Sequence, residues 1–318
     1  MKRTIYLLLV TLVGFTACKK DTPSSAHQDL QYAIDEALGL IESGIEGTAQ
    51  GQLAPGSKNQ LQAQVDWATF IMNGSGNDDA YTNALTILNA AIDAYKNNTV
   101  KPGTPKFGVN AFFNLGSCDS LIPDKQNFTI EVKAKLTDLN TDGTAKLGAF
   151  ITIDDKAKGI LLRYTNTGAV AAYVFTTAYI GATTAANTVV PGQWYHLTYT
   201  YDGTTITIYV NGVKKATANV TGAPRPTIIA AGSPTRLGMS RNSEWTATYL
   251  RSMHGNLKDV RFWNRALSEA EVNSYMDKTL TNAEPGLIAY WPFDLNLGTS
   301  VPAAVGNFTA VGTNISWE

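Results

Sequence analysis

The chain has few of the residues that carry covalent chemistry or strong surface charge. It contains two cysteines, Cys18 and Cys118, and three histidines in 318 residues. Charged residues make up 16% of the chain, and the net charge is −1. This composition excludes the basic surface that nucleic-acid binding requires. If Cys18 is modified, no disulfide can form, and stability then depends on the hydrophobic core alone.

Patterns typical of catalytic sites are also absent from the sequence. The histidines, His27, His196 and His254, lie far apart, and no HExxH, CxxC or GxSxG pattern occurs. A retaining glycoside hydrolase needs two carboxylates about 5 Å apart, which predicts carboxylates at alternate positions of a strand. The segment with Glu131 continues with lysines instead, and Glu244 stands alone. We therefore predict no enzymatic activity and interpret His196 as a packed scaffold residue.

The N-terminal residues are typical of an export signal. A basic start precedes a mostly apolar run at 5–15, which is too short to span a bilayer. The Phe-Thr-Ala-Cys sequence that ends at Cys18 resembles a bacterial lipobox. The resemblance implies that residues 1–17 are a cleaved signal peptide and that Cys18 carries lipid, with 18–27 as a polar tether. The alternative is an ordinary cleaved signal that contains a cysteine.

Residues 28–98 have the apolar period of amphipathic helices. Breaks at Pro55-Gly56 and at 74–77 divide the segment into three helices, which predicts a small three-helix domain. The segment resembles the three-helix modules of Bacteroidetes-type surface lipoproteins, for which no activity is implied. Two prolines and a glycine at 99–106 indicate a linker.

From residue 107 to 318 the apolar pattern alternates with a period of two, which is typical of β-strands. Many short strands separated by turn residues favour an antiparallel β-sandwich. The predicted strands are 108–115, 128–136, 146–153, 159–164, 170–176, 194–201, 205–210, 236–239, 257–263, 287–293 and 308–311.

The segment 194–212 shows this alternation most clearly. An Asp-Gly pair at 202 and an Asn-Gly pair at 211 are suited to the positive φ angles of hairpin turns. Between the pairs, the apolar residues fall on one face, which we expect to be buried. Thr207 and Tyr209 fall on the opposite face, which we expect to be wetter.

The segment 255–272 predicts a strand that ends in a short helix. Ser268 and Glu271 have the spacing of a capping box, in which each side chain binds the other residue's backbone N–H. Leu267 and Val272 occupy the positions of a hydrophobic staple. The chain is therefore expected to turn at a fixed angle there.

Taken in order, these segments carry a family resemblance. The stretches are FTIEVKAKL at 128–136, WYHLTYTYDGTTITIYVNGV at 194–213, RLGMS at 236–240, GNLKDVRFWNRALSEAEV at 255–272 and GLIAYWPFD at 286–294. Together they resemble the laminin-G-like, concanavalin A-like jelly-roll domain of bacterial surface proteins. The resemblance covers 107–318 and implies a two-sheet antiparallel sandwich after the helical domain. It also implies binding of glycans or proteins on one face or its rim loops, and calcium in some members.

One segment has the composition of a calcium loop. Asp138, Asn140 and Asp142 place oxygen ligands at alternate positions, and Gly143 follows. Ala149 stands where a helix–loop–helix site would have its bidentate glutamate. The alternative is a polar hairpin turn that uses Asp, Asn and Gly for their backbone tolerance. No cofactor is required, and calcium is the one metal for which the sequence offers ligands.

Carbohydrate binding needs exposed aromatic rings next to hydrogen-bonding side chains. Two groups of residues have this character. Each aromatic residue in them could instead be a packing residue. The first group, in a predicted loop, consists of Arg241, Asn242, Trp245 and Tyr249, and the second, on predicted strands, of Arg163, Tyr173 and Tyr179.

The sequence thus favours an outer-membrane lipoprotein, facing the periplasm or the cell surface, whose sandwich binds a glycan or polysaccharide without catalysis. Its contact with the membrane is expected through the lipid anchor only. One alternative is a structural or adhesion protein that binds a cell-surface partner protein. A third interpretation is an atypical glycoside hydrolase.

Overall fold

The computed structural model describes residues 23–74, 76–123, 125–139, 147–155, 158–175, 179–220, 234–240 and 251–318. The described chain divides into two compact units. A helical unit comprises residues 23–44 and 58–97, and a β unit comprises residues 45–57 and 98–318. The domain boundaries expected from the sequence stay predictions, and the two units are described separately below.

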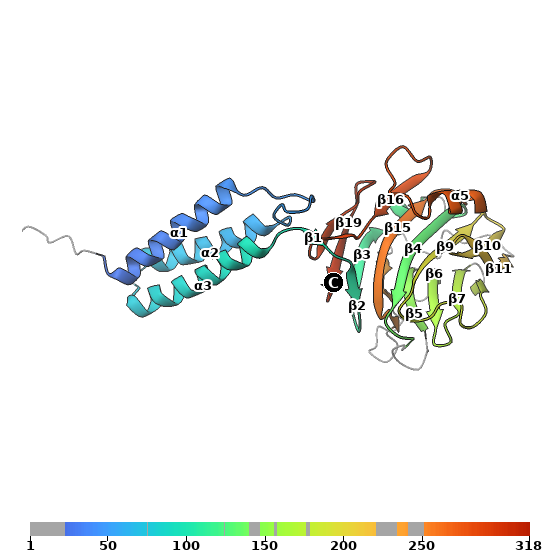
Figure 1. The fold of residues 1–318 in the computed structure, drawn as a ribbon, viewed down its shortest axis with the longest axis horizontal. Helices are drawn as coiled ribbons and strands as arrows, with labels where there is room; N and C mark the ends of the chain where they lie inside the picture. The colour runs from blue at the N-terminus through green and yellow to red at the C-terminus, as the bar shows by residue number, and fades with distance from the viewer. Residues whose placement is uncertain are drawn as a thin grey trace, which may run out of the picture. The chain divides into compact units, whose positions relative to one another are not determined.

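The helical unit contains the three helices that the sequence predicts. They are α1 (Ser25–Ser43), α2 (Ser57–Asn73) and α3 (Asp78–Asn97), all visible in Figure 1. Leu30, Leu61 and Leu88 are fully buried, one from each helix, because each helix turns one apolar stripe inward. The Tyr95 hydroxyl donates to the Leu40 carbonyl at 2.9 Å. None of the helices in the described residues is long and apolar enough to cross a bilayer.

The β unit is an antiparallel jelly-roll sandwich, as the sequence predicts. One sheet, called the β4 sheet, has the strand order β11-β10-β9-β4-β15-β2-β20, and β16 also pairs with β15. Its strands are β2 (Pro105–Phe107), β4 (Phe128–Leu136), β9 (Trp194–Tyr201), β10 (Thr205–Val210), β11 (Val213–Asn219), β15 (Gly255–Trp263), β16 (Leu287–Trp291) and β20 (Ser316–Trp317).

The other sheet, called the β6 sheet, has the strand order β18-β19-β3-β12-β5-β6-β7-β8. Its strands are β3 (Phe112–Ser117), β5 (Leu147–Asp155), β6 (Lys158–Thr165), β7 (Val170–Phe175), β8 (Tyr179–Thr183), β12 (Pro234–Leu237), β18 (Ser300–Pro302) and β19 (Thr309–Thr313). The smaller elements are β1 (Lys101–Pro102) with β17 (Leu295–Asn296), β13 (Met239–Ser240) with β14 (Arg251–Ser252), and α4 (Cys118–Leu121).

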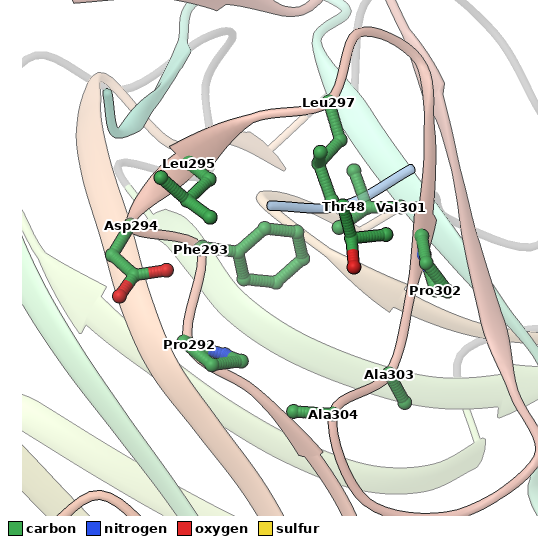
Figure 2. A pocket seen from close by; sticks show the side chains of 10 residues that line it. All are labelled: Thr48, Pro292, Phe293, Asp294, Leu295, Leu297, Val301, Pro302, Ala303 and Ala304. Carbon is green, nitrogen blue, oxygen red and sulfur yellow. The ribbon is translucent and has the colours of Figure 1, made fainter. Parts of the chain in front are cut away.

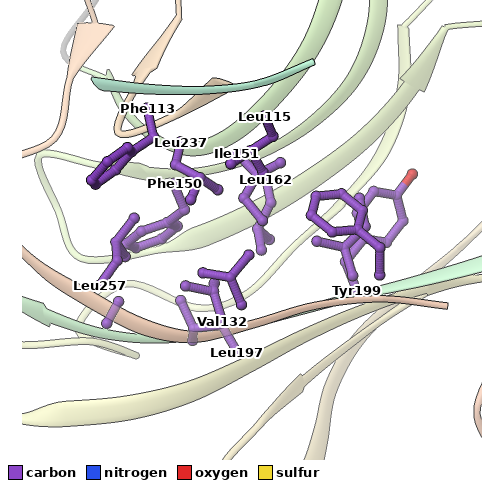
Figure 3. Packing of buried hydrophobic residues seen from close by; sticks show 14 of the residues in the cluster. Phe113, Leu115, Val132, Phe150, Ile151, Leu162, Leu197, Tyr199, Leu237 and Leu257 are labelled. Carbon is purple, nitrogen blue, oxygen red and sulfur yellow. The ribbon is translucent and has the colours of Figure 1, made fainter. Parts of the chain in front are cut away.

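The main core lies between the two sheets (Figure 3). Val132 and Leu197 come from the β4 sheet, Phe150 and Leu162 come from the β6 sheet, and all four are fully buried. Alternate residues of each strand supply this layer, since successive side chains of a strand point to opposite faces. Burying each such side chain stabilises the fold by about 1.5–3 kcal/mol.

The hairpins of the segment 194–212 are confirmed. Asn211 has φ +51° and Gly212 has φ +77°, which is the conformation that an Asn-Gly turn provides between β10 and β11. At the other turn, the Asp202 carboxylate accepts hydrogen bonds from the backbone N–H groups of Thr204 and Thr205. These turns fix the register of β9, β10 and β11.

A short helix covers part of the outer face of the β4 sheet. This helix, α5 (Glu269–Tyr275), begins with the capping box predicted for Ser268 and Glu271. Leu267 and Val272, the residues of the predicted staple, are buried in one cluster with Tyr209. The wetter face predicted for Tyr209 is therefore wrong: its side chain is 7% exposed, because a segment more than fifty residues later covers it.

Glu131 is fully buried on this covered face and is paired on several sides. The Trp263 indole N–H donates to Glu131 Oε2 at 2.8 Å, and Nε2 of His196 lies 3.2 Å from Glu131 Oε1. The Arg261 guanidinium is 3.6 Å from the same carboxylate. Burial raises the pKa of Glu131, but its bonds and charge interactions with His196, Arg261 and Trp263 outweigh burial and lower the pKa below its ordinary value.

Arg261 also holds the segment after α5 in place. Its guanidinium donates to the carbonyl oxygens of Tyr275 at 2.9 Å and Lys278 at 2.8 Å. The side chain is fully buried, and its charge is compensated by the equally buried Glu131 carboxylate at 3.6 Å and by the partly exposed Asp259 carboxylate at 3.8 Å. The covering segment is thus fixed to the sheet through one buried ion pair as well as through apolar contact.

We expect Glu131→Gln to lower the free energy of unfolding by about 3 kcal/mol at pH 7, because Arg261 loses its buried counter-charge. The contribution of Glu131 is complete above its ordinary pKa of 4.5 and is lost as pH falls through its lower folded pKa. The difference from the wild type should therefore narrow below pH 4.5. Urea unfolding across this pH range measures it, with the exposed Glu42→Gln as control. A loss under about 1 kcal/mol would contradict the ion-pair argument.

Candidate functional site

The structure brings together the three strand residues predicted to bind carbohydrate. Arg163, Tyr173 and Tyr179 lie on the outer face of the β6 sheet, on the neighbouring strands β6, β7 and β8. The Arg163 guanidinium carbon is 4.3 Å from the centre of the Tyr173 ring. The rings of Tyr173 and Tyr179 meet edge to face, with centres 6.1 Å apart. We call these three residues, together with Phe175, the β6 surface.

The β6 surface forms because successive side chains of β7 and β8 point to opposite faces of the sheet. Val170, Ala172 and Val174 point into the core, so Tyr173 points outward with Phe175. Gly181 pairs with Tyr173 across the strands, and a Cβ atom there would clash with the Tyr173 ring. The glycine thus leaves room for the ring to lie over β8.

The β6 surface combines an aromatic face with a cation. Tyr179 is 40% exposed, and its ring centre lies 5.1 Å from that of Phe175. Burial raises the pKa of Tyr173, but the hydrogen bond with the Thr183 hydroxyl and the nearby Arg163 guanidinium outweigh burial and lower it. Such a surface can stack against a sugar ring and hydrogen-bond its hydroxyls.

Two further residues on this face were not predicted from the sequence. Phe175 was detectable, because it follows Tyr173 by two positions and so shares its face. Arg236 of β12 lies in the same row across the sheet as Tyr173, through the pairs Arg236–Thr152, Thr152–Leu161 and Leu161–Tyr173. Its position depends on strand order, which the local pattern does not reveal.

The other residues predicted to bind carbohydrate form the first group of the sequence-based prediction. Arg241, Asn242, Trp245 and Tyr249 lie outside the described residues. The same is true of Cys18, the predicted lipidation site. These assignments stay predictions.

The predicted calcium ligands are only partly described. Asp138 is half-buried, and its Oδ1 lies 3.2 Å from Nδ1 of His254. Asn140 and Asp142 lie outside the described residues. Within the described part of the chain, no group of three His, Cys, Asp or Glu side chains could hold a metal ion. The Asp138 carboxylate is thus shared with an imidazole, a nitrogen donor that calcium does not prefer.

A small cavity of about 150 Å³ lies elsewhere in the β unit, around the loops that follow β16 (Figure 2). The Phe293 ring points into it, between Leu297 and Val301 on one side and Leu295 on the other. Asp294 and Thr48 supply polar groups at its rim. Ligand pockets usually measure about 300–1,000 Å³, so this cavity is too small for an oligosaccharide.

The described histidines and Glu131 do not form a catalytic group. Glu131 and His196 are buried together beneath the covering segment, so neither can reach a substrate. His254 is paired with Asp138 instead. Glu244 lies outside the described residues. The scaffold interpretation of His196 agrees with its burial.

The β unit is similar to known proteins in sequence pattern and in fold. The family model of the concanavalin A-like lectin/glucanases superfamily matches residues 107–273, more than half of the chain. A proposed carbohydrate-binding protein from Bacteroides ovatus has a similar structure, with a TM-score of 0.52 and 18% sequence identity. That match covers 68% of this chain but only 59% of the Bacteroides ovatus chain. No curated protein matches this chain in sequence.

Two further solved structures are similar to this chain with lower TM-scores. A SAP-like pentraxin from Limulus polyphemus is 15% identical, with a TM-score of 0.45 over 68% of this chain and 94% of its own. The CBM40 module of a Ruminococcus gnavus IT-sialidase, bound to α2,3-sialyllactose, is 16% identical, with a TM-score of 0.40. It aligns with 55% of this chain and 96% of its own. At these identities the likeness concerns the fold alone.

Arg163→Gln should raise the pKa of Tyr173, because the guanidinium next to the ring favours the phenolate. An NMR titration of ¹³C-tyrosine-labelled protein measures the shift, and Tyr173→Phe assigns the signal. Lys214→Gln removes a cation from the exposed edge strand β11 and should leave this pKa unchanged. An unchanged Tyr173 pKa in Arg163→Gln would mean that the two side chains do not pack together in solution.

Proposed function

Because the chain belongs to the concanavalin A-like lectin/glucanases superfamily, we propose that its β unit binds carbohydrate without catalysing a reaction on it. The observation that carries this proposal is the β6 surface, where Arg163, Tyr173 and Tyr179 meet on three neighbouring strands. The Bacteroides ovatus structure, with a TM-score of 0.52, supports the fold on which such binding depends.

The chemistry of the β6 surface fits a sugar better than a fully apolar ligand. The Tyr179 ring is exposed enough to stack on the C–H face of a pyranose. Arg163 carries several planar N–H donors, which suit neighbouring sugar hydroxyls. Rigid strands hold these groups, so little ordering entropy is lost on binding.

The proposal that the protein does not catalyse a reaction rests on the position of Glu131, the one carboxylate of strand β4. Glu131 is enclosed by Trp263, His196 and Arg261 and is fully buried. A glycosidase acid or nucleophile has to contact the glycosidic bond. Release of sugar products from polysaccharide by the wild-type protein would instead support the hydrolase alternative.

We expect Tyr179→Ala to weaken glycan binding by up to about tenfold, since one stacked ring contributes roughly 0.5–1.5 kcal/mol. A glycan array with the full chain identifies the best ligand, and isothermal titration then measures its affinity. Tyr32→Ala is the matched control, because Tyr32 is 70% exposed on α1 of the helical unit. Equal affinity of Tyr179→Ala and wild type would place the glycan elsewhere.

A partner protein is the second candidate, and one observation favours it. Tyr32 and Phe70 are 70% and 75% exposed on the helical unit, although aromatic side chains are usually buried. If Tyr179→Ala and Tyr32→Ala both keep wild-type glycan affinity, and Phe70→Ala no longer binds a cell-surface partner protein, this candidate is favoured over the carbohydrate proposal.

The proposed location is the outer membrane, with the lipid on Cys18 as the only membrane contact. The lipobox-like sequence and the polar residues after it support this proposal. Cys18→Ser should abolish labelling by radioactive palmitate and shift the protein from the membrane to the soluble fraction. Cys118→Ser is the matched control, because Cys118 is buried in the β unit. Unchanged labelling of Cys18→Ser would exclude lipidation at this residue.

A further inference from the structure

A row of polar side chains crosses the outer face of the β4 sheet, beside the part that α5 covers. Strand pairing aligns Ser316, Lys106, Asn256, Lys135 and Trp194 on β20, β2, β15, β4 and β9. Figure 1 shows β2, β15, β4 and β9 side by side. Register partners point to the same side of a sheet, and the neighbours of Lys106 and Lys135 on their strands point into the core. The row therefore faces outward.

Two lysines in this region gather around one indole ring. The Lys135 ammonium is 5.5 Å from the centre of the Trp194 ring, and the Lys258 ammonium is 4.7 Å from it. Trp194, Lys135 and Lys258 are all half-buried, so the cluster is accessible while its side chains are restrained. We call these three residues the Trp194 cluster.

The lysines of the Trp194 cluster differ from the neighbouring Lys133 in the ion pairs that they form with described residues. Lys133, the register partner of Lys258, lies 3.2 Å from carboxylate oxygens of both Asp259 and Asp277. By contrast, neither Lys135 nor Lys258 forms an ion pair with a carboxylate of the described residues. Like charges on adjacent strands repel each other, so an anion placed between the two ammonium groups would be stabilised.

The far end of the same row already holds a carboxylate. Glu318 Oε2 lies 2.7 Å from Nζ of Lys106. The hydrogen bond from Lys106 lowers the pKa of Glu318 against a smaller effect of burial, and Asn256 and Lys135 lower it further. The row therefore favours a negatively charged oxygen group next to its lysines.

We infer that the Trp194 cluster is a second binding site, which takes a carbohydrate with carboxylate or sulfate groups. The anionic group lies between the ammonium groups of Lys135 and Lys258 in charge-assisted hydrogen bonds. The sugar ring that carries it packs against the exposed part of the Trp194 indole. This site lies on the sheet opposite to the β6 surface, so it does not depend on the proposed function of that surface.

The test compares Lys135→Gln/Lys258→Gln with Lys214→Gln/Lys215→Gln in the full chain. Both double variants lose two positive charges, but Lys214 and Lys215 lie exposed on the edge strand β11. Isothermal titration uses polygalacturonate for carboxylate, dextran sulfate for sulfate, and neutral dextran, at low and high salt. We expect at least one polyanion to bind the wild type, more weakly as salt screens the charges. The Lys135/Lys258 variant should bind at least tenfold more weakly, and the control within twofold of the wild type.

Several outcomes would overturn this inference. Failure of the wild type to bind either polyanion would do so. Equal loss of affinity in both double variants would do so as well, because it would indicate attraction by net charge alone. Equally tight binding of polyglutamate, a polyanion without sugar rings, would remove the role of Trp194. Loss of polyanion binding in Tyr179→Ala but not in Lys135→Gln/Lys258→Gln would assign the anionic sugar to the β6 surface. That last result would keep the proposed carbohydrate function and reject only the second site.

Discussion

The buried carboxylate of Glu131 is the constraint on which the arrangement of the β4 sheet depends. A strand in a sandwich turns every second residue away from the core, and those residues are usually solvated. Here the segment around α5 covers them, so the charge of Glu131 must be compensated inside the protein. Arg261, Trp263 and His196 do this, and Arg261 in turn holds the backbone of the covering segment. Removing the carboxylate would therefore disturb the packing of the covering segment on the sheet.

The covering segment divides the outer face of the β4 sheet into a covered part and an open part. Where α5 covers the β4 sheet, polar residues pair with each other and contribute to stability only. Beyond this cover, Lys135 and Lys258 form no ion pair with a carboxylate of the described residues, and both ammonium groups lie next to the Trp194 ring, which suits them to an anionic ligand. On the other sheet, Arg163 and the tyrosines next to it form an aromatic and cationic face. Both candidate sites thus lie on rigid strands, which favours binding over conformational switching.

Sequence patterns predicted the elements whose neighbours are local. The strands 128–136, 194–201 and 205–210 have the predicted bounds, because each alternates strongly and ends at a turn residue. The edge strands β8 and β11 were missed, since nearly all of their side chains are exposed or half-buried and no apolar alternation marks them. The β6 surface was predictable because its residues alternate on consecutive strands. The Trp194 cluster was not predictable from the sequence. Lys258 lies near Trp194 because β15 pairs with β4 and β4 pairs with β9, and the local pattern does not reveal this strand order.

The net charge of the chain is −1, but acidic and basic side chains are distributed unevenly between the helical unit and the β unit. This distribution affects which ligand each unit attracts. In residues 23–44 and 58–97 the acidic side chains outnumber the two lysines, Lys58 and Lys96. The β unit carries a small excess of basic side chains, and several of them gather on the outer face of the β4 sheet. An anionic polysaccharide is therefore attracted to the β unit and repelled by the helical unit. The same separation of charge makes the exposed aromatic residues of the helices better suited to a neutral or basic partner than to the ligand of the Trp194 cluster.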